Sequence, residues 1–200
     1  MFIYWKFEAQ QENLTIESHE ENQQMAIIKK GLLLVFTGNG KGKTTSAIGL
    51  SIRAAGNNMP ICFIQFIKGS WKYGELDALK RFDDLIDFHV MGRGFTWKSD
   101  DLEKDKALAR CGWEKAKEAI SSGKYKMVVL DEFTYLLKYG MLEKEEVLQV
   151  LKNKPEDVHL VITGRDALPE IIDAADLVTE MQAVKHPYKS GIKAQKGIEF

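Results

Sequence analysis

The residues with the clearest chemical meaning are the glycines, lysines and threonines of positions 38–45, Gly-Asn-Gly-Lys-Gly-Lys-Thr-Thr. An apolar segment, Leu32–Thr37, precedes them, and a helical pattern follows directly. Glycines let consecutive backbone N–H groups face an anion, and the N-terminus of the following helix adds partial positive charge. Lys43 is placed to reach a phosphate group, and the Thr44 hydroxyl to bind Mg²⁺. The segment predicts a P-loop that binds a nucleoside triphosphate, rather than a glycine-rich surface turn.

This loop is one residue shorter than the standard pattern G-x-x-x-x-G-K-[ST]. Thr37 occupies the position of the first glycine, and Lys41 adds a second positive charge inside the loop. We expect the tighter loop to hold a triphosphate differently from an ordinary ATPase. The candidate phosphate-binding residues are Gly38, Asn39, Gly40, Lys41, Gly42, Lys43, Thr44 and Thr45.

A second motif places two carboxylates after a buried strand. Residues 127–130 are Met-Val-Val-Leu, and Asp131 and Glu132 follow. Open parallel sheets bind ligands at the carboxyl ends of their strands. Either acid could therefore bind Mg²⁺ (or Mn²⁺), directly or through water, opposite Thr44. An apolar run ending in two acids is also typical of a solvated strand end, but its place downstream of a P-loop favours the metal site.

Arg165 follows another apolar segment, in the sequence Thr163-Gly164-Arg165. Its guanidinium could lie near phosphate or adenine, since arginine suits phosphate groups. A surface turn is an equally good interpretation of these three residues.

Short apolar runs alternate with helical patterns along the chain. Strands are expected at 32–37, 61–66, 86–90, 127–131, 158–163 and 177–180, and helices at about 43–56, 74–82, 101–122, 143–152 and 167–175. This alternation predicts an α/β fold, a doubly wound, mostly parallel sheet of about six strands with helices on both faces. With the P-loop motif, the expected fold is of the P-loop NTPase (RecA-like) type. Residues 26–200 are expected to form a single domain, preceded by a polar segment, 1–25, that is mobile or a peripheral helix.

Composition limits the classes of partner. The chain has 200 residues and a net charge of −1, so no basic footprint for nucleic acid is present. No apolar run approaches the roughly 18 residues of a membrane span. The isolated Cys62 and Cys111 suit a reducing compartment, and a cytoplasmic location is the expectation.

His89 lies in a D-x-H-x-x-G pattern, Asp87 to Gly92. In flavodoxin-like B12-binding domains, the histidine of this pattern binds cobalt. Here the histidine falls within an alternating strand pattern, not in a loop after a strand. A motif outside its structural context carries little weight. We therefore interpret His89 as an ordinary strand residue.

The chain also carries an ordered set of short motifs, which occur in the segments 66–69, 74–75, 92–97, 130–132, 163–165, 175–181, 185–187 and 194–199. Together with the short T-G-N-G-K-G-K-T-T loop, they closely resemble the P-loop family of corrinoid adenosyltransferases. The resemblance covers about residues 27–200. It implies that Co(I) of a corrinoid attacks C5′ of ATP and that inorganic triphosphate leaves. It also implies that the triphosphate lies in the loop in the reverse sense to ordinary NTPases, with Lys43 among the catalytic residues.

Phe95 and Trp97 are two residues apart in a glycine-flanked segment, which puts both rings on one side of an extended loop. On spacing alone, a pair of core aromatics is the better interpretation. The resemblance instead implies that both face the corrin, displace its lower ligand and have a catalytic role. It further implies a reduced flavoprotein as electron donor and a homodimer.

Two alternatives remain open from the sequence. A P-loop kinase or ATPase would share Lys43, Thr44 and Asp131, and would use Glu132 to position the attacking group. A nucleotide-dependent binding module that delivers a corrinoid would bind ATP without turnover. Intact triphosphate as the product would indicate adenosyl transfer, and ADP with phosphate would indicate a kinase or ATPase. ATP binding without either product would indicate the binding module.

Overall fold

The computed structural model describes residues 30–199 except 68, 70–72, 93 and 95–101. The expected N-terminal segment, 1–25, therefore lies outside the described residues. Within the described part, none of the helices combines the length and the apolar character needed to cross a membrane.

The centre of the fold is a parallel sheet of six strands. They are β1 (Leu33–Thr37), β2 (Ile61–Gln65), β3 (Ile86–Val90), β4 (Met127–Asp131), β5 (His159–Thr163) and β6 (Leu177–Glu180). Their spatial order is β3-β2-β4-β5-β1-β6, and every neighbouring pair runs parallel. β1, β2 and β4 are buried along their whole length, as expected for apolar strands covered on both faces.

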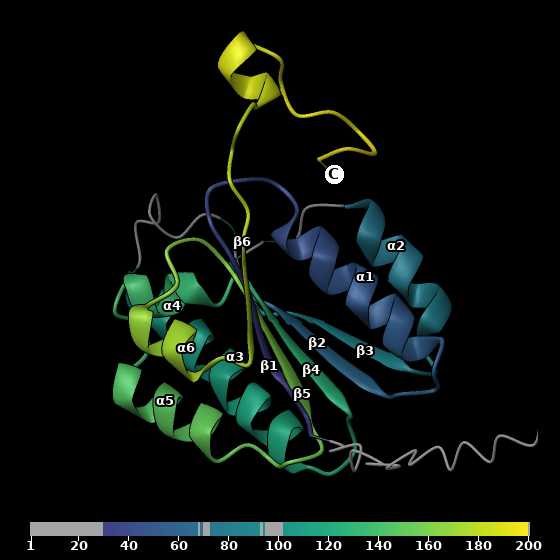
Figure 1. The fold of residues 1–200 in the computed structure, drawn as a ribbon, viewed down its shortest axis with the longest axis vertical. Helices are drawn as coiled ribbons and strands as arrows, with labels where there is room; N and C mark the ends of the chain where they lie inside the picture. The colour runs from purple at the N-terminus through teal and green to yellow at the C-terminus, as the bar shows by residue number, and fades with distance from the viewer. Residues whose placement is uncertain (1–29, 68, 70–72, 93, 95–101, 200) are drawn as a thin grey trace, which may run out of the picture.

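Helices cover both faces of this sheet (Figure 1). One face carries α1 (Lys43–Ala55) and α2 (Gly74–Leu79), which continues as the 3₁₀ helix η1 (Lys80–Phe82). The other face carries α3 (Leu102–Ser121), α4 (Thr134–Lys138), α5 (Lys144–Lys152) and α6 (Pro169–Ala174). The predicted α/β class and doubly wound arrangement are confirmed.

The two faces have separate hydrophobic cores because strand side chains alternate in direction. Leu34 and Phe36 of β1 pack in the cluster that includes Ala47 and Ala54 of α1. Leu33 and Val35 pack in the other cluster, with Trp113 of α3. The carboxyl ends of the strands emerge between these two layers, and the P-loop lies there.

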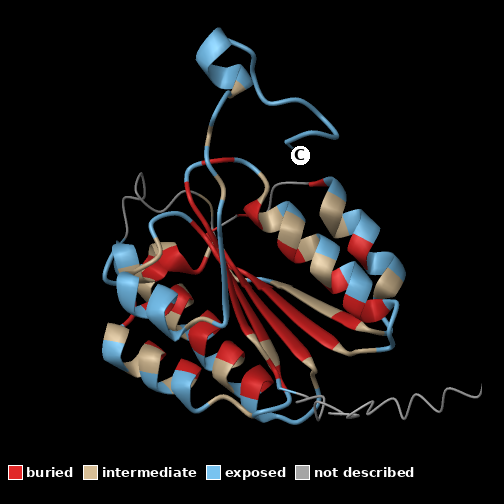
Figure 2. Ribbon diagram, viewed as in Figure 1, coloured by how far each residue is buried: buried red, intermediate tan, exposed pale blue. Residues whose placement is uncertain are grey.

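The sequence missed two short helices, α4 and the 3₁₀ helix η3 (Pro187–Ser190). His89 lies within β3, as predicted. β6 pairs with β1 as an edge strand whose four residues are all exposed. Beyond it, residues 182–199, here called the β6 extension, leave the body of the domain and are largely exposed (Figure 2).

Candidate functional site

The predicted P-loop connects β1 to α1, and two of its glycines adopt left-handed conformations that favour glycine. Gly38 has φ of 93° and Gly42 has φ of 118°. The carbonyl of Gly42 accepts a hydrogen bond from the N–H of Ser46 at 2.7 Å and so closes the first turn of α1. The loop therefore ends at a helix N-terminus, where backbone N–H groups favour an anion.

The first part of the loop packs against the chain that follows β6. A Cβ atom at Gly38 would lie 2.5 Å from the carbonyl oxygen of Met181, and one at Gly40 would lie 2.6 Å from the same oxygen. The N–H of Gly40 donates to this oxygen at 2.5 Å, and the N–H of Met181 donates to the Thr37 carbonyl at 2.9 Å. Only glycine fits beside this backbone, so Met181 fixes the shape of the shortened loop.

Thr37, which replaces the first glycine of the standard pattern, is the last residue of β1. Its hydroxyl accepts a hydrogen bond from the N–H of Ala167 at 3.2 Å. The side chain thus joins the P-loop strand to the loop after β5. Sequence reasoning assigned it no such role.

Lys43 is the first residue of α1 and is only 7% exposed. Its ammonium donates to the carbonyl oxygens of Gly38 at 2.8 Å and Gly40 at 2.7 Å. Burial lowers the pKa of Lys43 below its usual 10.5, an effect that the nearby Glu132 carboxylate opposes. An ammonium has three N–H donors, so two can hold the loop closed while a third serves a bound phosphate.

Asp131, at the end of β4, is fully buried between its neighbouring strands. One carboxylate oxygen accepts from the hydroxyl of Thr163 on β5 at 2.7 Å, and the other accepts from Nε2 of Gln65 on β2 at 3.0 Å. The Thr163 hydroxyl in turn accepts from the N–H of Glu132 at 2.9 Å. Asp131 therefore ties three strand ends together and is not part of the cavity lining.

Glu132 turns out of the sheet with φ of 59°, a conformation that is uncommon for a residue other than glycine. Its side chain lines the same cavity as the P-loop. Backbone conformations of this kind cost of order 1–3 kcal/mol and concentrate at functional sites. Of the two predicted acids, Glu132 is the one that faces the cavity.

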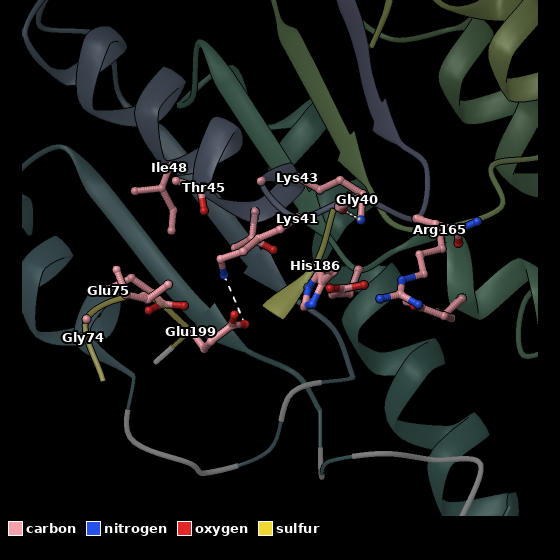
Figure 3. Close-up of a pocket in the computed structure, with 17 residues that line it drawn as sticks. Gly40, Lys41, Lys43, Thr45, Ile48, Gly74, Glu75, Arg165, His186 and Glu199 are labelled. Atoms are coloured by element: carbon pink, nitrogen blue, oxygen red, sulfur yellow. Dashed lines mark hydrogen bonds and ion pairs between the residues drawn. The ribbon is translucent and has the colours of Figure 1, made fainter. Parts of the chain in front are cut away.

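Arg165 is held at the far wall of the cavity, across from Gly74 and Glu75 (Figure 3). The hydroxyl of Thr134 on α4 donates to the Arg165 carbonyl at 2.6 Å and fixes the turn after β5. The Arg165 guanidinium contributes to lowering the pKa of Lys43. Arg165 thus belongs to the cavity and not to a remote surface turn.

The cavity has a volume of about 650 Å³, within the usual range for small-molecule sites. Its lining includes most of the predicted phosphate-binding residues together with residues from four other segments. The lining residues are Asn39, Gly40, Lys41, Gly42, Lys43, Thr44, Thr45, Ile48, Gly74, Glu75, Glu132, Tyr135, Arg165, His186, Gly197, Ile198 and Glu199.

Several lining residues had no role in the sequence interpretation. Tyr135 comes from the short helix α4, and burial raises its pKa to about 12. His186 and Glu199 come from the β6 extension. Of the predicted residues, Gly38 lies behind the loop against Met181. Phe95 and Trp97 lie outside the described residues.

The cavity suits a divalent cation bound together with phosphates. The Thr44 hydroxyl and the Glu132 carboxylate line the same space, and both are oxygen donors of the kind that Mg²⁺ prefers. Within the described ranges, no group of three or more His, Cys, Asp or Glu side chains is placed to hold a metal ion. A cation here would depend on ligand phosphates, which is typical of Mg²⁺.

A parallel sheet with helices on both faces, a glycine-rich loop between β1 and α1 and an acid after β4 define an α/β protein of the P-loop type. The comparisons with known proteins are more specific. The family model described as ATP:corrinoid adenosyltransferase BtuR/CobO/CobP matches residues 29–200. The chain belongs to this family.

Similar proteins named corrinoid adenosyltransferase cover most of the chain. One from Sinorhizobium sp is 47% identical over 86% of this chain and 81% of its own length. One from Pseudomonas aeruginosa is 46% identical over 90% of this chain and 89% of its own. One from Escherichia coli is 42% identical over 86% of this chain and 87% of its own. These matches favour adenosyl transfer over the kinase or ATPase alternative.

Proposed function

We propose that this protein transfers the 5′-deoxyadenosyl group of ATP to the Co(I) centre of a corrinoid and releases inorganic triphosphate. Its product is adenosylcobalamin or a precursor. The observation that carries the proposal is the cavity in which the short P-loop, Glu132 and Arg165 meet in a member of this family.

In this proposal the loop holds the triphosphate as a leaving group. Lys41, Lys43 and Arg165 supply positive charge, and the N-terminus of α1 supplies backbone N–H groups. Such donors stabilise the negative charge that develops on the departing triphosphate, and one donor of this kind can be worth about 100-fold in rate. No side-chain nucleophile is needed, because the electron pair that attacks C5′ belongs to the cobalt of the substrate.

Thr44 and Glu132 are the residues that would hold Mg²⁺ beside the phosphates. Bound Mg²⁺ supplies charge neutralisation and orients the triphosphate. Asp131 would act one step further back, since its hydrogen bond to Thr163 positions the start of the segment that carries Glu132.

In this proposal the corrinoid binds against Phe95 and Trp97, which would displace its lower axial ligand and ease reduction of the cobalt. An apolar wall at this position would also keep water from the strongly reducing Co(I).

The proposal extends to the cellular setting. A reduced flavoprotein would supply the electron, and the enzyme would act as a homodimer. A cytoplasmic location fits a supply of ATP and the free thiols of Cys62 and Cys111. The domain would span residues 26–200.

The test is incubation with chemically reduced cobalamin and Mg²⁺-ATP. We expect a light-sensitive organocobalt product and one equivalent of inorganic triphosphate. Release of ADP and phosphate would instead support phosphoryl transfer, and ATP binding without either product would support a delivery module. Omission of the corrinoid is the control, because triphosphate release should depend on it.

A further inference from the structure

The β6 extension returns to the nucleotide cavity after it has left the body of the domain. It begins beside Met181, whose backbone is bonded to the P-loop strand and to Gly40. It then passes through η3 (Figure 1), and residues near its end line the cavity. Its residues in the cavity lining are His186, Gly197, Ile198 and Glu199.

A tight turn presents Glu199 to the cavity. The N–H groups of Ile198 and Glu199 both donate to the carbonyl oxygen of Gln195, at 3.1 and 2.8 Å. Gly197 has φ of 79°, in the left-handed region that favours glycine. This turn brings the Glu199 carboxylate to the P-loop, where it accepts a hydrogen bond from the Lys41 ammonium at 3.2 Å (Figure 3).

A carboxylate on a P-loop lysine offers the same chemistry as a phosphate oxygen, an anionic acceptor for the same donor. A bound triphosphate and the Glu199 carboxylate would repel each other if both occupied the cavity. We propose that Glu199 is an internal competitor of triphosphate for Lys41. ATP displaces it on binding, and its return after the reaction promotes release of the triphosphate. This inference rests on the proposed function, because triphosphate is the product that must leave.

The strength of the contact suits a competitor. Lys41 and Glu199 side chains are 42% and 28% exposed, and ion pairs this close to solvent are weak and screened by salt. The extension that carries Glu199 leaves Val184 and Tyr188 91% and 77% exposed, so it buries little apolar surface of its own. Segments with few buried contacts open at low free-energy cost. The extension can therefore lift from the loop without unfolding the domain.

The experiment measures binding of inorganic triphosphate, with Mg²⁺, to Glu199→Gln and to the unaltered protein by calorimetry. We expect Glu199→Gln to bind about fivefold more tightly at low salt, and we expect the difference to shrink at high salt. Asp173→Asn is the matched control, because Asp173 is an exposed carboxylate on α6 and its loss changes the net charge equally. Its affinity should equal that of the unaltered protein.

A second variant tests whether the effect passes through Lys41. In a Lys41→Gln background, Glu199→Gln should change the affinity for triphosphate by less than about twofold. Removal of residues 195–200 should tighten binding at least as much as Glu199→Gln does. Thermal unfolding of each variant checks that it is folded.

Equal or weaker triphosphate binding by folded Glu199→Gln overturns the inference, as does a tightening that persists without Lys41. Failure of all proteins to bind triphosphate overturns it as well. The proposed function is judged separately, by the organocobalt product of the unaltered protein. A protein that forms this product but shows no effect of Glu199→Gln would refute the competition alone.

Discussion

Asp131 and Glu132 are adjacent acids that should respond in opposite ways to neutral substitution. Asp131→Asn replaces one carboxylate oxygen, which accepts a hydrogen bond from Thr163 or Gln65, with an amide NH₂ group that can only donate one. Rotation of the Gln65 amide could relieve part of this conflict, since its Oε1 has no hydrogen-bond partner among the described residues. The loss is then that of charge-assisted hydrogen bonds, so we expect the free energy of unfolding to fall by about 1–3 kcal/mol.

Glu132→Gln should leave stability nearly unchanged, within about 0.5 kcal/mol, because the side chain faces the cavity and the backbone conformation is kept. Its effect should fall on the reaction instead. If Glu132 helps to hold Mg²⁺, we expect Mg²⁺-dependent triphosphate release to fall by about 100-fold.

The two assays are urea unfolding without ligands, and triphosphate release from ATP with reduced corrinoid over a range of Mg²⁺ concentrations. A weaker dependence on Mg²⁺ should distinguish Glu132→Gln from Asp131→Asn. The reasoning is wrong if Asp131→Asn keeps full stability while losing its response to Mg²⁺, or if Glu132→Gln is the less stable variant.

Four further predictions concern the loop, the helix layer and the aromatic pair. Gly40→Ala should lower the free energy of unfolding by about 1–3 kcal/mol, because its Cβ would lie 2.6 Å from the Met181 carbonyl oxygen; unchanged urea unfolding would contradict this. Lys43→Arg should reduce triphosphate release by about 100-fold, since a guanidinium does not replace a compact ammonium held between two carbonyls; a near-normal rate would show that the compact group is not required. Glu146→Gln should lower the free energy of unfolding by about 1 kcal/mol at pH 7, because the Glu146 carboxylate accepts hydrogen bonds from three donors on α3. These donors lower the pKa of Glu146 from 4.5 to about 2. The unaltered protein and Glu146→Gln should therefore differ fully in free energy of unfolding above pH 5, and the difference should vanish as the pH falls to about 2. A difference that grows in acid would refute the assignment. Trp97→Ala should impair activity mainly when cob(II)alamin must be reduced in the site, and equal losses with pre-reduced cob(I)alamin would exclude that role.

Much of the fold follows from the sequence because local signals and tertiary structure agree. Most strands appear as short apolar runs, and β6 was predicted at 177–180 even though its residues are exposed. α4 was missed because it has only five residues and its N-cap, Phe133, makes no side-chain capping hydrogen bond. η3 was missed because it has only four residues, too few for any periodicity.

Some features of the candidate site could likewise be predicted from the sequence, and others could not. The meeting of the loop and the acid pair at one edge of the sheet could be predicted, because each follows directly from a strand whose carboxyl end had to reach that edge. For Arg165 the sequence left a surface turn as an equally good interpretation. The separate positions of Asp131 and Glu132 could not, since they depend on the left-handed backbone at Glu132 and on Gln65 and Thr163 from other strands. The contribution of the β6 extension depends on the path of the chain in space, which no local pattern records.

The shortened loop and the chain that follows β6 are linked by direct contacts. The Met181 backbone packs against the shortened loop and lies within hydrogen-bonding distance of Gly40. Met181 directly follows β6, the edge strand that pairs with β1, so the chain after β6 supports the loop from behind. The same chain carries Glu199 to Lys41 of the loop. One continuous segment thus contacts the phosphate loop twice, through Met181 at its start and Glu199 near its end. In the competition proposed above, the position of this segment and the binding of an anion in the loop influence each other.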